Sequence, residues 1–325
     1  MQLFKKILNT FNGLYYPQEY LCLAKEKFEQ PLRTYLVNNN RVIKEVTGHY
    51  LFTGYCPLVF TFYSSPADHL ELSDSIELIF SDHSLPSNEF LKKKDAIAAL
   101  SLKMIDRQSA GNNEIVYYEG VHGSHQFISS FHQSVNGLYN RLYNKKPGNV
   151  FLHDNLYKQV QIAYSIPRII SLVTVENNGL YNLFPTDLHG PVGEQYYVSS
   201  LRHEGKACRQ VQSAGRIVIS TIHCDSYKTV YSLGKNHMQD VRAKEDFPVS
   251  DKRSAVFQLP LPQAVLYYRE LELIESFRHG IHQFLFYKTI SANVVNSEPA
   301  TLAHIHNVYA TWRQSKGLSG NYLLR

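Results

Sequence analysis

The sequence is poor in the features that mark metal-bound, secreted and membrane proteins. Its four cysteines, Cys22, Cys56, Cys208 and Cys224, lie far apart and form no C-x-x-C pair, so neither a zinc knuckle nor a redox dithiol is indicated. No apolar run reaches the about 20 residues that a membrane-spanning helix needs. The opening segment MQLFKKILNTFNGLYY lacks the continuous apolar core of a secretory signal. We therefore expect a cytoplasmic protein with no membrane segment.

Clusters of basic residues and of metal ligands are also scarce. The formal net charge is +5, and the lysine runs are short, at 92–94 and 145–146. A nucleic-acid-binding protein usually gathers its basic residues on one face or helix, so we predict no nucleic-acid partner and at most one local anion site. His122, His125 and His132 lie close together, but the glycine between the first two argues against a helix that would align them. No metal is predicted.

The chain does contain enough apolar and aromatic residues for a large β-rich fold. Of its 325 residues, 44% are hydrophobic, 13% aromatic and 19% charged, which is typical of a globular protein with a sizeable core. Aromatic residues suit pleated, half-buried surfaces. The length allows two domains, and the charged Pro-Gly segment NKKPGN (144–149) predicts the boundary. We expect an α+β domain of unknown role at 1–148 and a second domain at 149–325.

Periodicity predicts a helix at each end of the chain and mainly strands between them. In the first half, the predicted elements are a helix over 3–11, two strands around an Asn-rich turn at 33–46, a strand at 75–81 and a helix with one apolar face over 128–142. In the second half, they are strands at 157–166, 168–175, 179–184, 194–201, 216–222, 264–276 and 281–290, a helix over 207–215 capped by Gly215, and a closing helix over 299–317 that ends at Gly317.

The loop SSLRHEGKACR (199–209) is the first candidate for a ligand site. It brings Arg202 and Lys206 to the start of the predicted helix, where free backbone N–H groups and the helix dipole attract anions. Ser199 and Ser200 offer hydroxyl donors beside them. Taken alone, the loop is more typical of a solvated charged segment.

Two further polar segments are candidates. Asn182, Thr186 and Asp187 follow the Asn-Gly hairpin, although Thr and Asp also cap backbone groups in ordinary turns. His282 opens a strand just after Gly280. A lone histidine is more often packed or exposed than a ligand, so each segment alone favours a structural role.

Together, these segments resemble the flavin reductase-like family of FMN-binding split barrels. The resemblance covers about residues 155–310 and rests on five motifs that follow one another in the family's order. These are SIPRIISLVTV (165–175), Asn182-Leu183-Phe184-Pro185-Thr186-Asp187, SSLRHEGKACRQVQSAG (199–215), GRIVIST (215–221) and AVLYYRELELIESFRHGIHQFLFYKTI (264–290). The chain departs from the family's pattern at three positions. Asp187 stands where the family usually has serine, Cys208 replaces the threonine after the lysine, and Ile281 replaces the aspartate before the histidine.

The resemblance implies a six-stranded antiparallel split β-barrel in the second domain of a mainly β chain, assembled as a homodimer. It implies FMN as the cofactor, with its phosphate in the basic loop and its ring against the strand end at 182–186. The flavin supplies the hydride chemistry with a nicotinamide nucleotide, so no catalytic residue is named. The implied cofactor-binding residues are Asn182, Leu183, Phe184, Thr186, Asp187, Ser199, Ser200, Arg202, Lys206 and His282.

Three functions remain open at this stage. The first is an NAD(P)H-dependent, flavin reductase-like oxidoreductase. The second is a non-catalytic binding or interaction protein with an altered or lost flavin site, which the three departures favour. The third keeps the barrel but takes another ligand, as in relatives of pyridoxamine-phosphate oxidase or heme-binding split barrels.

Overall fold

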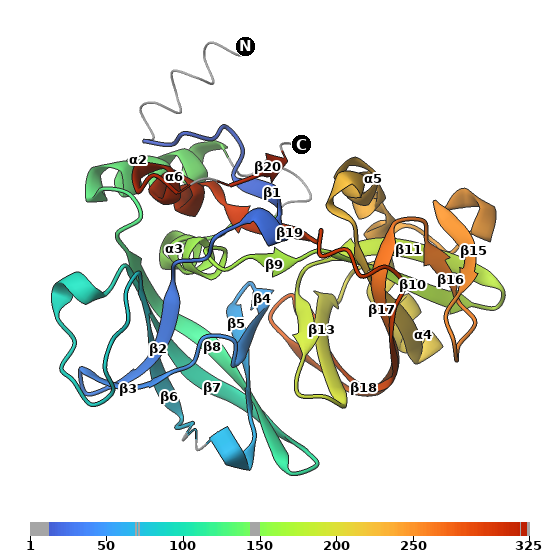
Figure 1. Ribbon diagram of the computed structural model, residues 1–325, viewed down its shortest axis with the longest axis horizontal. Helices are drawn as coiled ribbons and strands as arrows, with labels where there is room; N and C mark the ends of the chain where they lie inside the picture. The colour runs from blue at the N-terminus through green and yellow to red at the C-terminus, as the bar shows by residue number, and fades with distance from the viewer. Residues whose placement is uncertain (1–12, 69, 71, 144–149, 319, 324–325) are drawn as a thin grey trace. The chain divides into compact units, whose positions relative to one another are not determined.

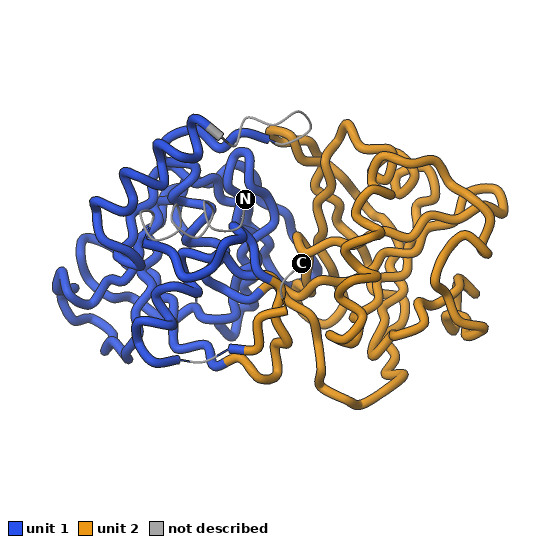
Figure 2. Tube along the Cα trace, turned by 90° about the horizontal axis from the view of Figure 1, so that it is seen from above, with its two compact units in different colours: residues 1–21, 29–167, 305–320 blue, residues 22–28, 168–304, 321–325 orange. Residues whose placement is uncertain are grey.

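The chain folds into two compact units. The computed structural model describes residues 13–323 except 69, 71, 144–149 and 319. Unit 1 comprises residues 1–21, 29–167 and 305–320, and unit 2 comprises 22–28, 168–304 and 321–325 (Figure 2). The predicted helix over 3–11 and the predicted boundary segment 144–149 lie outside the described residues. The chain passes between the units at five places, one of them between Pro167 and Arg168, and residues 150–167 belong to unit 1. The division into domains at 148/149 stays a prediction.

Unit 1 is built on one antiparallel sheet of seven strands. The strand order is β3-β2-β6-β7-β8-β5-β4 (Figure 1). The strands are β2 (Arg33–Asn38), β3 (Arg41–Glu45), β4 (Tyr50–Tyr55), β5 (Leu58–Ser64), β6 (Ser75–Ser81), β7 (Ala98–Ala110) and β8 (Asn113–His125). Two short 3-10 turns, η2 (Pro66–Asp68) and η3 (Lys93–Asp95), lie in its connections. The predicted α+β character of this half agrees with the sheet and its helices.

Three α-helices lie in the described part of unit 1. They are α2 (Ser130–Tyr143), α3 (Asp154–Ala163) and α6 (Asn307–Ser315). The closing helix predicted over 299–317 is wrong in its first part, because Leu302–His306 form a strand and the helix begins at Asn307. The strand prediction for 157–166 is wrong, because this segment forms most of α3. Val160 and Ile162 alternate with glutamines as in a strand, but the helix is buried on almost every side, so its apolar residues do not mark one face. Gly120 and Gly123 of β8 allow this close packing, since a Cβ at either would meet the Gln159 side chain.

Unit 2 also contains an antiparallel sheet of seven strands. The strand order is β11-β10-β14-β17-β18-β13-β12. The strands are β10 (Ser171–Asn177), β11 (Leu180–Thr186), β12 (His189–Pro191), β13 (Tyr196–Arg202), β14 (Arg216–Ile222), β17 (Val265–His279) and β18 (His282–Val294). The mainly β fold class is therefore confirmed for the described chain.

Smaller elements complete unit 2. A two-stranded sheet pairs β15 (Val249–Arg253) with β16 (Pro260–Pro262). A separate four-stranded sheet has the order β20-β1-β19-β9, and its strands β1 and β19 each include residues assigned to unit 1. The strands of the latter are β1 (Tyr20–Ala24), β9 (Arg168–Ile169), β19 (Leu302–His306) and β20 (Tyr322–Leu323). The helical segments are α4 (Lys206–Ala214), α5 (Tyr227–Ser232) and the 3-10 turns η1 (Lys25–Lys27), η4 (Cys224–Ser226), η5 (Leu233–Met238) and η6 (Lys244–Asp246). None of the described helices is both long and apolar enough to cross a membrane.

Local sequence explains the turns and the helix that shape unit 2. Asn178 and Gly179 both have positive φ, as the tight turn between β10 and β11 requires. Helix α4 starts after Gly205 and ends at Gly215, whose φ of 67° gives the left-handed cap predicted from the sequence. The buried side of α4 presents Ala207, Cys208 and Val211 to the sheet.

The core of unit 2 lies between α4 and one face of its sheet. Phe184 is fully buried in this core, together with Val173 and Leu271 of neighbouring strands. Because α4 contributes three residues to the same cluster, this packing fixes the helix, and with it the loop before the helix, against the sheet.

We expect Phe184→Ala to destabilise unit 2 by about 3–5 kcal/mol, because the truncation leaves a cavity beneath α4. The free energy of unfolding, measured with urea, tests this. Leu180→Ala on the same strand is the control, since Leu180 is 42% exposed, and it should shift stability by less than about 0.5 kcal/mol. Equal losses in the two variants would contradict this description of the core.

Candidate functional site

The predicted site residues fall on two faces of the unit 2 sheet. Side chains alternate along a strand, so neighbours in sequence point to opposite faces. Phe184 faces the core beneath α4, and Ser199 is buried on β13, where its hydroxyl contacts the Tyr287 hydroxyl at 3.2 Å. Leu183 packs in a different buried cluster with Leu172. These three predicted residues contribute to packing inside the fold.

Three other predicted residues meet at the ends of two paired strands. Arg202 at the end of β13 lies directly opposite His282 at the start of β18. The Ser200 hydroxyl lies 3.2 Å from Nδ1 of His282. His282 is 1% exposed and Ser200 is 2% exposed. The structure thus brings together the basic loop and the Gly280 turn, which are far apart in the sequence.

The loop between β13 and α4 is a tight turn that leaves little room for a side chain at Gly205. The Gly205 N–H donates to the Arg202 carbonyl at 3.0 Å. A Cβ on Gly205 would lie 3.1 Å from that carbonyl oxygen and 3.3 Å from the His237 carbonyl oxygen. Because this turn is compact, the N-terminus of α4 starts close to Arg202. Its first N–H groups have no partners within the helix, so they suit an anion.

Lys206 is the first residue of α4, and its ammonium group pairs with Asp240 at 2.6 Å. Both side chains are substantially exposed, at 38% and 78%. An exposed pair of this kind is worth little in free energy, so it would not prevent Lys206 from binding a more strongly charged group.

Asp187 belongs to an ionic cluster with Arg168 and His304. Its carboxylate lies 2.8 Å from the Arg168 guanidinium and 2.6 Å from Nδ1 of His304. Nε2 of His304 in turn contacts the hydroxyl of Tyr231. The charge of Arg168 and the hydrogen bond from His304 outweigh burial and hold the pKa of Asp187 well below its usual range. The acid that departs from the family pattern is thus neutralised by neighbours that the sequence analysis did not identify.

The outer edge of β11 is covered by the segment after α5. Tyr181 and Arg242 exchange two backbone hydrogen bonds, each 2.7 Å long. Further along the edge, the Asn236 amide donates to the Leu183 carbonyl, and Nε2 of His237 lies 2.7 Å from the Pro185 carbonyl. This edge was the expected place for backbone contacts to a flavin ring, and most of its polar groups already have partners.

Asn182 belongs to the same covering arrangement. Its side-chain amide donates to the Gln210 side chain at 2.7 Å and to the Asn236 carbonyl at 3.0 Å. Asn182 is fully buried, so it connects β11 to α4 and to η5. Thr186, four residues further along β11, is also buried, with 8% exposure.

Burial keeps the histidines around the site neutral. It lowers the pKa of His282 to about 3, and the nearby positive charge of Arg202 adds to this effect. The pKa of His237 is lowered for the same two reasons, although its bond to the Pro185 carbonyl opposes them. His237 is a site residue that sequence reasoning missed, since nothing in its surrounding sequence distinguishes it from the other histidines. At neutral pH the positive charge of the site therefore comes from Arg202 and Lys206.

Cys208 does not face the basic loop either. It is 1% exposed in the core beneath α4, and burial raises the pKa of its thiol to about 11. Ile281 forms the turn after Gly280, and its carbonyl accepts the His203 N–H at 3.1 Å. Of the three departures from the family pattern, Cys208 thus packs in the core, and Asp187 is paired within an ionic cluster.

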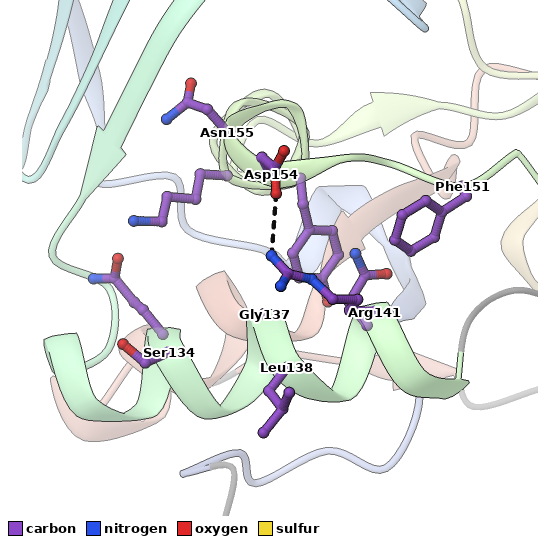
Figure 3. Close-up of a pocket in the computed structure, with 11 residues that line it drawn as sticks. Ser134, Gly137, Leu138, Arg141, Phe151, Asp154 and Asn155 are labelled. Carbon is purple, nitrogen blue, oxygen red and sulfur yellow. Dashed lines mark hydrogen bonds and ion pairs between the residues drawn. The ribbon is translucent and has the colours of Figure 1, made fainter.

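A separate pocket lies in unit 1 between α2 and α3 (Figure 3). Its volume is about 450 Å³, and Arg141 pairs with Asp154 across it at 3.2 Å. Both side chains are largely exposed, so the pair contributes little to stability. The pocket contains none of the predicted site residues.

One group of potential metal ligands lies in unit 2. Ligand atoms of His223, Cys224 and Asp225 lie within 4.8 Å of one another. However, Nδ1 of His223 already accepts the Asp225 N–H, and burial raises the pKa of the Cys224 thiol. Nε2 of His223 also lies 3.3 Å from the Glu298 carboxylate, so both ring nitrogens have partners within the fold.

Because His282 is buried in its neutral form, we expect it to make stability depend on pH. Its folded-state pKa lies below the unfolded value of about 6.5, so the unfolded chain binds the proton more readily. Stability is therefore full above pH 6.5 and falls as the pH drops toward 3, by about 1.4 kcal/mol per pH unit for this residue. In His282→Asn, the decline of the melting temperature between pH 7 and 5 should be shallower than in the wild type. Identical slopes would show that His282 is not buried as a neutral group.

Sequence comparisons found no relatives. No family model matches the chain, and no curated protein matches it.

Solved structures similar to about half of the chain were found. NADH:FAD oxidoreductase SgcE6 of Streptomyces globisporus has a TM-score of 0.40 and 10% identity, and the match covers 50% of this chain and 96% of that chain. For the FMN-binding protein of Thermus thermophilus, the TM-score is 0.37 and the identity 17%, over 47% and 80% of the two chains. For the styrene monooxygenase flavin reductase of Pseudomonas putida, they are 0.36 and 13%, over 43% and 87%. About half of this chain is thus similar in structure to flavin reductases and FMN-binding proteins.

Proposed function

We propose that unit 2 binds a flavin, FMN in the first place, and acts as a flavin reductase-like oxidoreductase that uses a nicotinamide nucleotide. The main support for this proposal is that Arg202, the N-terminus of α4 and the Ser200–His282 pair lie together at one end of the sheet. The choice of a flavin rests on the five sequence motifs, which contribute these same residues.

The phosphate fits the basic loop. Arg202 supplies a planar fork of donors that matches two phosphate oxygens, and Lys206 supplies a second positive charge. The free N–H groups at the start of α4 point in the direction that favours an anion. Since Asp187 is paired with Arg168 and His304, its charge opposes a phosphate less than a free carboxylate would.

The ring fits less well at the edge of β11. Pro185 has no N–H to offer, and the Tyr181 N–H is bonded to Arg242. We therefore assign the ring to the strand ends near Thr186, Ser200 and His282 rather than to the edge between 181 and 185. There, the buried Ser200–His282 pair fixes the strand ends against which the ring would lie.

When bound, the flavin accepts and donates hydride, which is chemistry that the protein side chains do not perform. The chain's own residues then bind and orient. Arg202 and Lys206 hold the phosphate, and the Ser200–His282 pair is fixed by burial. We expect the barrel to be the six-stranded split barrel of the family, made of β10, β11, β13, β14, β17 and β18. The homodimer and the cytoplasmic location stay predictions.

A second candidate function follows from the covered edge of β11. If η5 keeps its bonds to Leu183 and Pro185, unit 2 binds a phosphorylated ligand without redox turnover, as a binding protein. The colour of the purified protein separates the two functions. Flavin absorption bands, with FMN released on denaturation, support the oxidoreductase, whereas a colourless protein that takes up no added FMN excludes it.

The phosphate assignment predicts the effect of two substitutions. Arg202→Ala and Lys206→Ala should each weaken FMN binding about tenfold or more, since a hydrogen bond to a charged group contributes about 1.5–3 kcal/mol. Quenching of flavin fluorescence on titration with protein gives the dissociation constant.

Arg216→Ala is the matched control for these variants. It removes the same charge from an exposed arginine that lies on β14 and pairs with Glu176 at 3.7 Å, so it should leave FMN binding within about twofold. Unchanged binding in the Arg202 and Lys206 variants would refute the assignment of the phosphate to this loop.

A further inference from the structure

The sheets of the two units have the same topology. If the seven strands of each sheet are numbered in chain order, the unit 1 sheet β3-β2-β6-β7-β8-β5-β4 reads 2-1-5-6-7-4-3. The unit 2 sheet β11-β10-β14-β17-β18-β13-β12 gives the same order. The pair β15 and β16 forms a separate sheet inserted between the fifth and sixth strands of unit 2. Seven strands can be arranged in many orders, so a shared order calls for a closer comparison.

The long central hairpins agree residue by residue. Hairpin β7–β8 corresponds to β17–β18 when 169 is added to each residue number, so that the pair Ala110↔Asn113 becomes His279↔His282. Each hairpin contains two β-bulges, and these also correspond. The extra residues are Ile105 and Val121 in unit 1, and Ile274 and Ile290 in unit 2. A bulge bends and twists its strand at a defined place, so four coincident bulges indicate one shared hairpin design.

The tight turns correspond as well. The central hairpins turn at Gly111 and Gly280, with φ of 64° and 56°, and only the first of the two turn residues is left-handed in each. The hairpins of the first two strands turn at 39–40 and 178–179, where both turn residues have positive φ. Thus each unit has one turn of each kind, at the same point of its topology.

The equivalent strands also bury equivalent residues. Residues 115–118 of β8 are all fully buried, and residues 284–287 of β18 are at most 5% exposed. The other pairings extend the match, since Phe60↔Tyr118 corresponds to Tyr197↔Tyr287. Few residues are identical, among them Leu102 and Leu271, or Tyr118 and Tyr287, so the likeness is one of register rather than of sequence.

We propose that residues 33–125 and 171–294 are two copies of one seven-stranded fold, and that only the second copy has a site for an anionic ligand, so that each chain binds one such ligand through unit 2. The ligand in this inference rests on the proposed function. The correspondence of the two copies does not.

The register identifies the place in unit 1 that corresponds to the site. Ser64↔Glu114 is equivalent to Leu201↔Gln283, so the next pair, Ser65 and Asn113, takes the places of Arg202 and His282. The buried Ser200 corresponds to Tyr63. Neither Ser65 nor Asn113 carries a charge, so the two positions equivalent to Arg202 and His282 hold no cation in the first copy.

The loop after β5 bears the opposite charge. The Asp68 carboxylate accepts hydrogen bonds from the N–H and the hydroxyl of Ser65, each 2.7 Å long. These bonds hold the pKa of Asp68 below its usual value, so the group is anionic at neutral pH. Of the residues described between 65 and 74, only Pro66–Asp68 form a helical turn, the short η2, whereas the equivalent connection in unit 2 contains α4. Lys44 reaches this loop, but its ammonium group donates to the Asp68 carbonyl. An anion at this place in unit 1 would meet the Asp68 carboxylate and an engaged lysine instead of an arginine and a helix N-terminus.

Calorimetric titration of the full-length wild-type chain with FMN tests the single site. We expect a stoichiometry of one FMN per chain and the loss of this binding in the double variant Arg202→Ala/Lys206→Ala. If each chain had two sites, the double variant would lose only one of them and would still bind one FMN per chain. Counting per chain makes the result independent of how many chains assemble.

The outcomes separate the two proposals. A stoichiometry of two, or one FMN still bound by the double variant, overturns the single-site inference while flavin binding stands. No binding by the wild type overturns the proposed function, and the single-site claim with it. A third outcome is one FMN per chain whose binding is lost in Asp68→Ala or Ser65→Ala but kept in Arg202→Ala. This would place the site in unit 1 instead of unit 2 and also overturn the inference.

An exchange of hairpin tips tests the duplication without any ligand. Residues 107–114 are replaced by residues 276–283, which keeps a glycine at position 111. In the matched control they are replaced by residues 277–284, which puts isoleucine at 111, where φ is positive, and shifts each side chain to the opposite face. The first chimera should melt within about 5 °C of the wild type and the second at least about 10 °C lower. If the two melt alike, the hairpins are not equivalent and the duplication is refuted.

Discussion

The arrangement of unit 2 depends on how the outer edge of β11 is satisfied. β11 is the last strand of its sheet, so its edge presents backbone groups that must find partners other than a further strand. The segment from Asn236 to Arg242 provides them, and Asn182 and Gln210 tie the same segment to α4. This one contact series fixes the helix, the basic loop before it, and the part of the sheet that remains open to a ligand.

The sequence predicts those parts of the site that are marked by local chemistry. A turn needs glycine or asparagine and an anion site needs cations near a helix start, so Arg202, Lys206 and the turn at Gly280 are visible in the sequence. The partners of Asp187 are not, because Arg168 and His304 come from distant strands, and neither has a distinctive neighbourhood. The sequence also cannot tell which of two adjacent serines faces the core. Ser199 and Ser200 are neighbours on β13, so their side chains point to opposite faces of the sheet, and only the register of the strand decides which face each one takes.

The fold shows the same limit on a larger scale. Amphipathic hairpins are predicted well because alternation and turn residues coincide. Helix α3 is not, since burial on almost all sides removes the contrast between its faces. The likeness of the two halves is invisible in the sequence because strand register and bulges constrain which positions are buried, but not which apolar residue fills them. Residues such as Ile115 and Phe284 can therefore differ while the backbone pairing stays the same.

The position of Cys208 affects how the protein responds to oxidants and thiol reagents. Oxidation and alkylation proceed through the thiolate, and a thiol with a pKa near 11 in the core beneath α4 rarely forms one. Cys22 and Cys224 are buried as well, and Cys56 is the one cysteine with intermediate exposure. A maleimide dye would consequently attach to unit 1, where it could report on the whole chain without disturbing the helix that precedes β14.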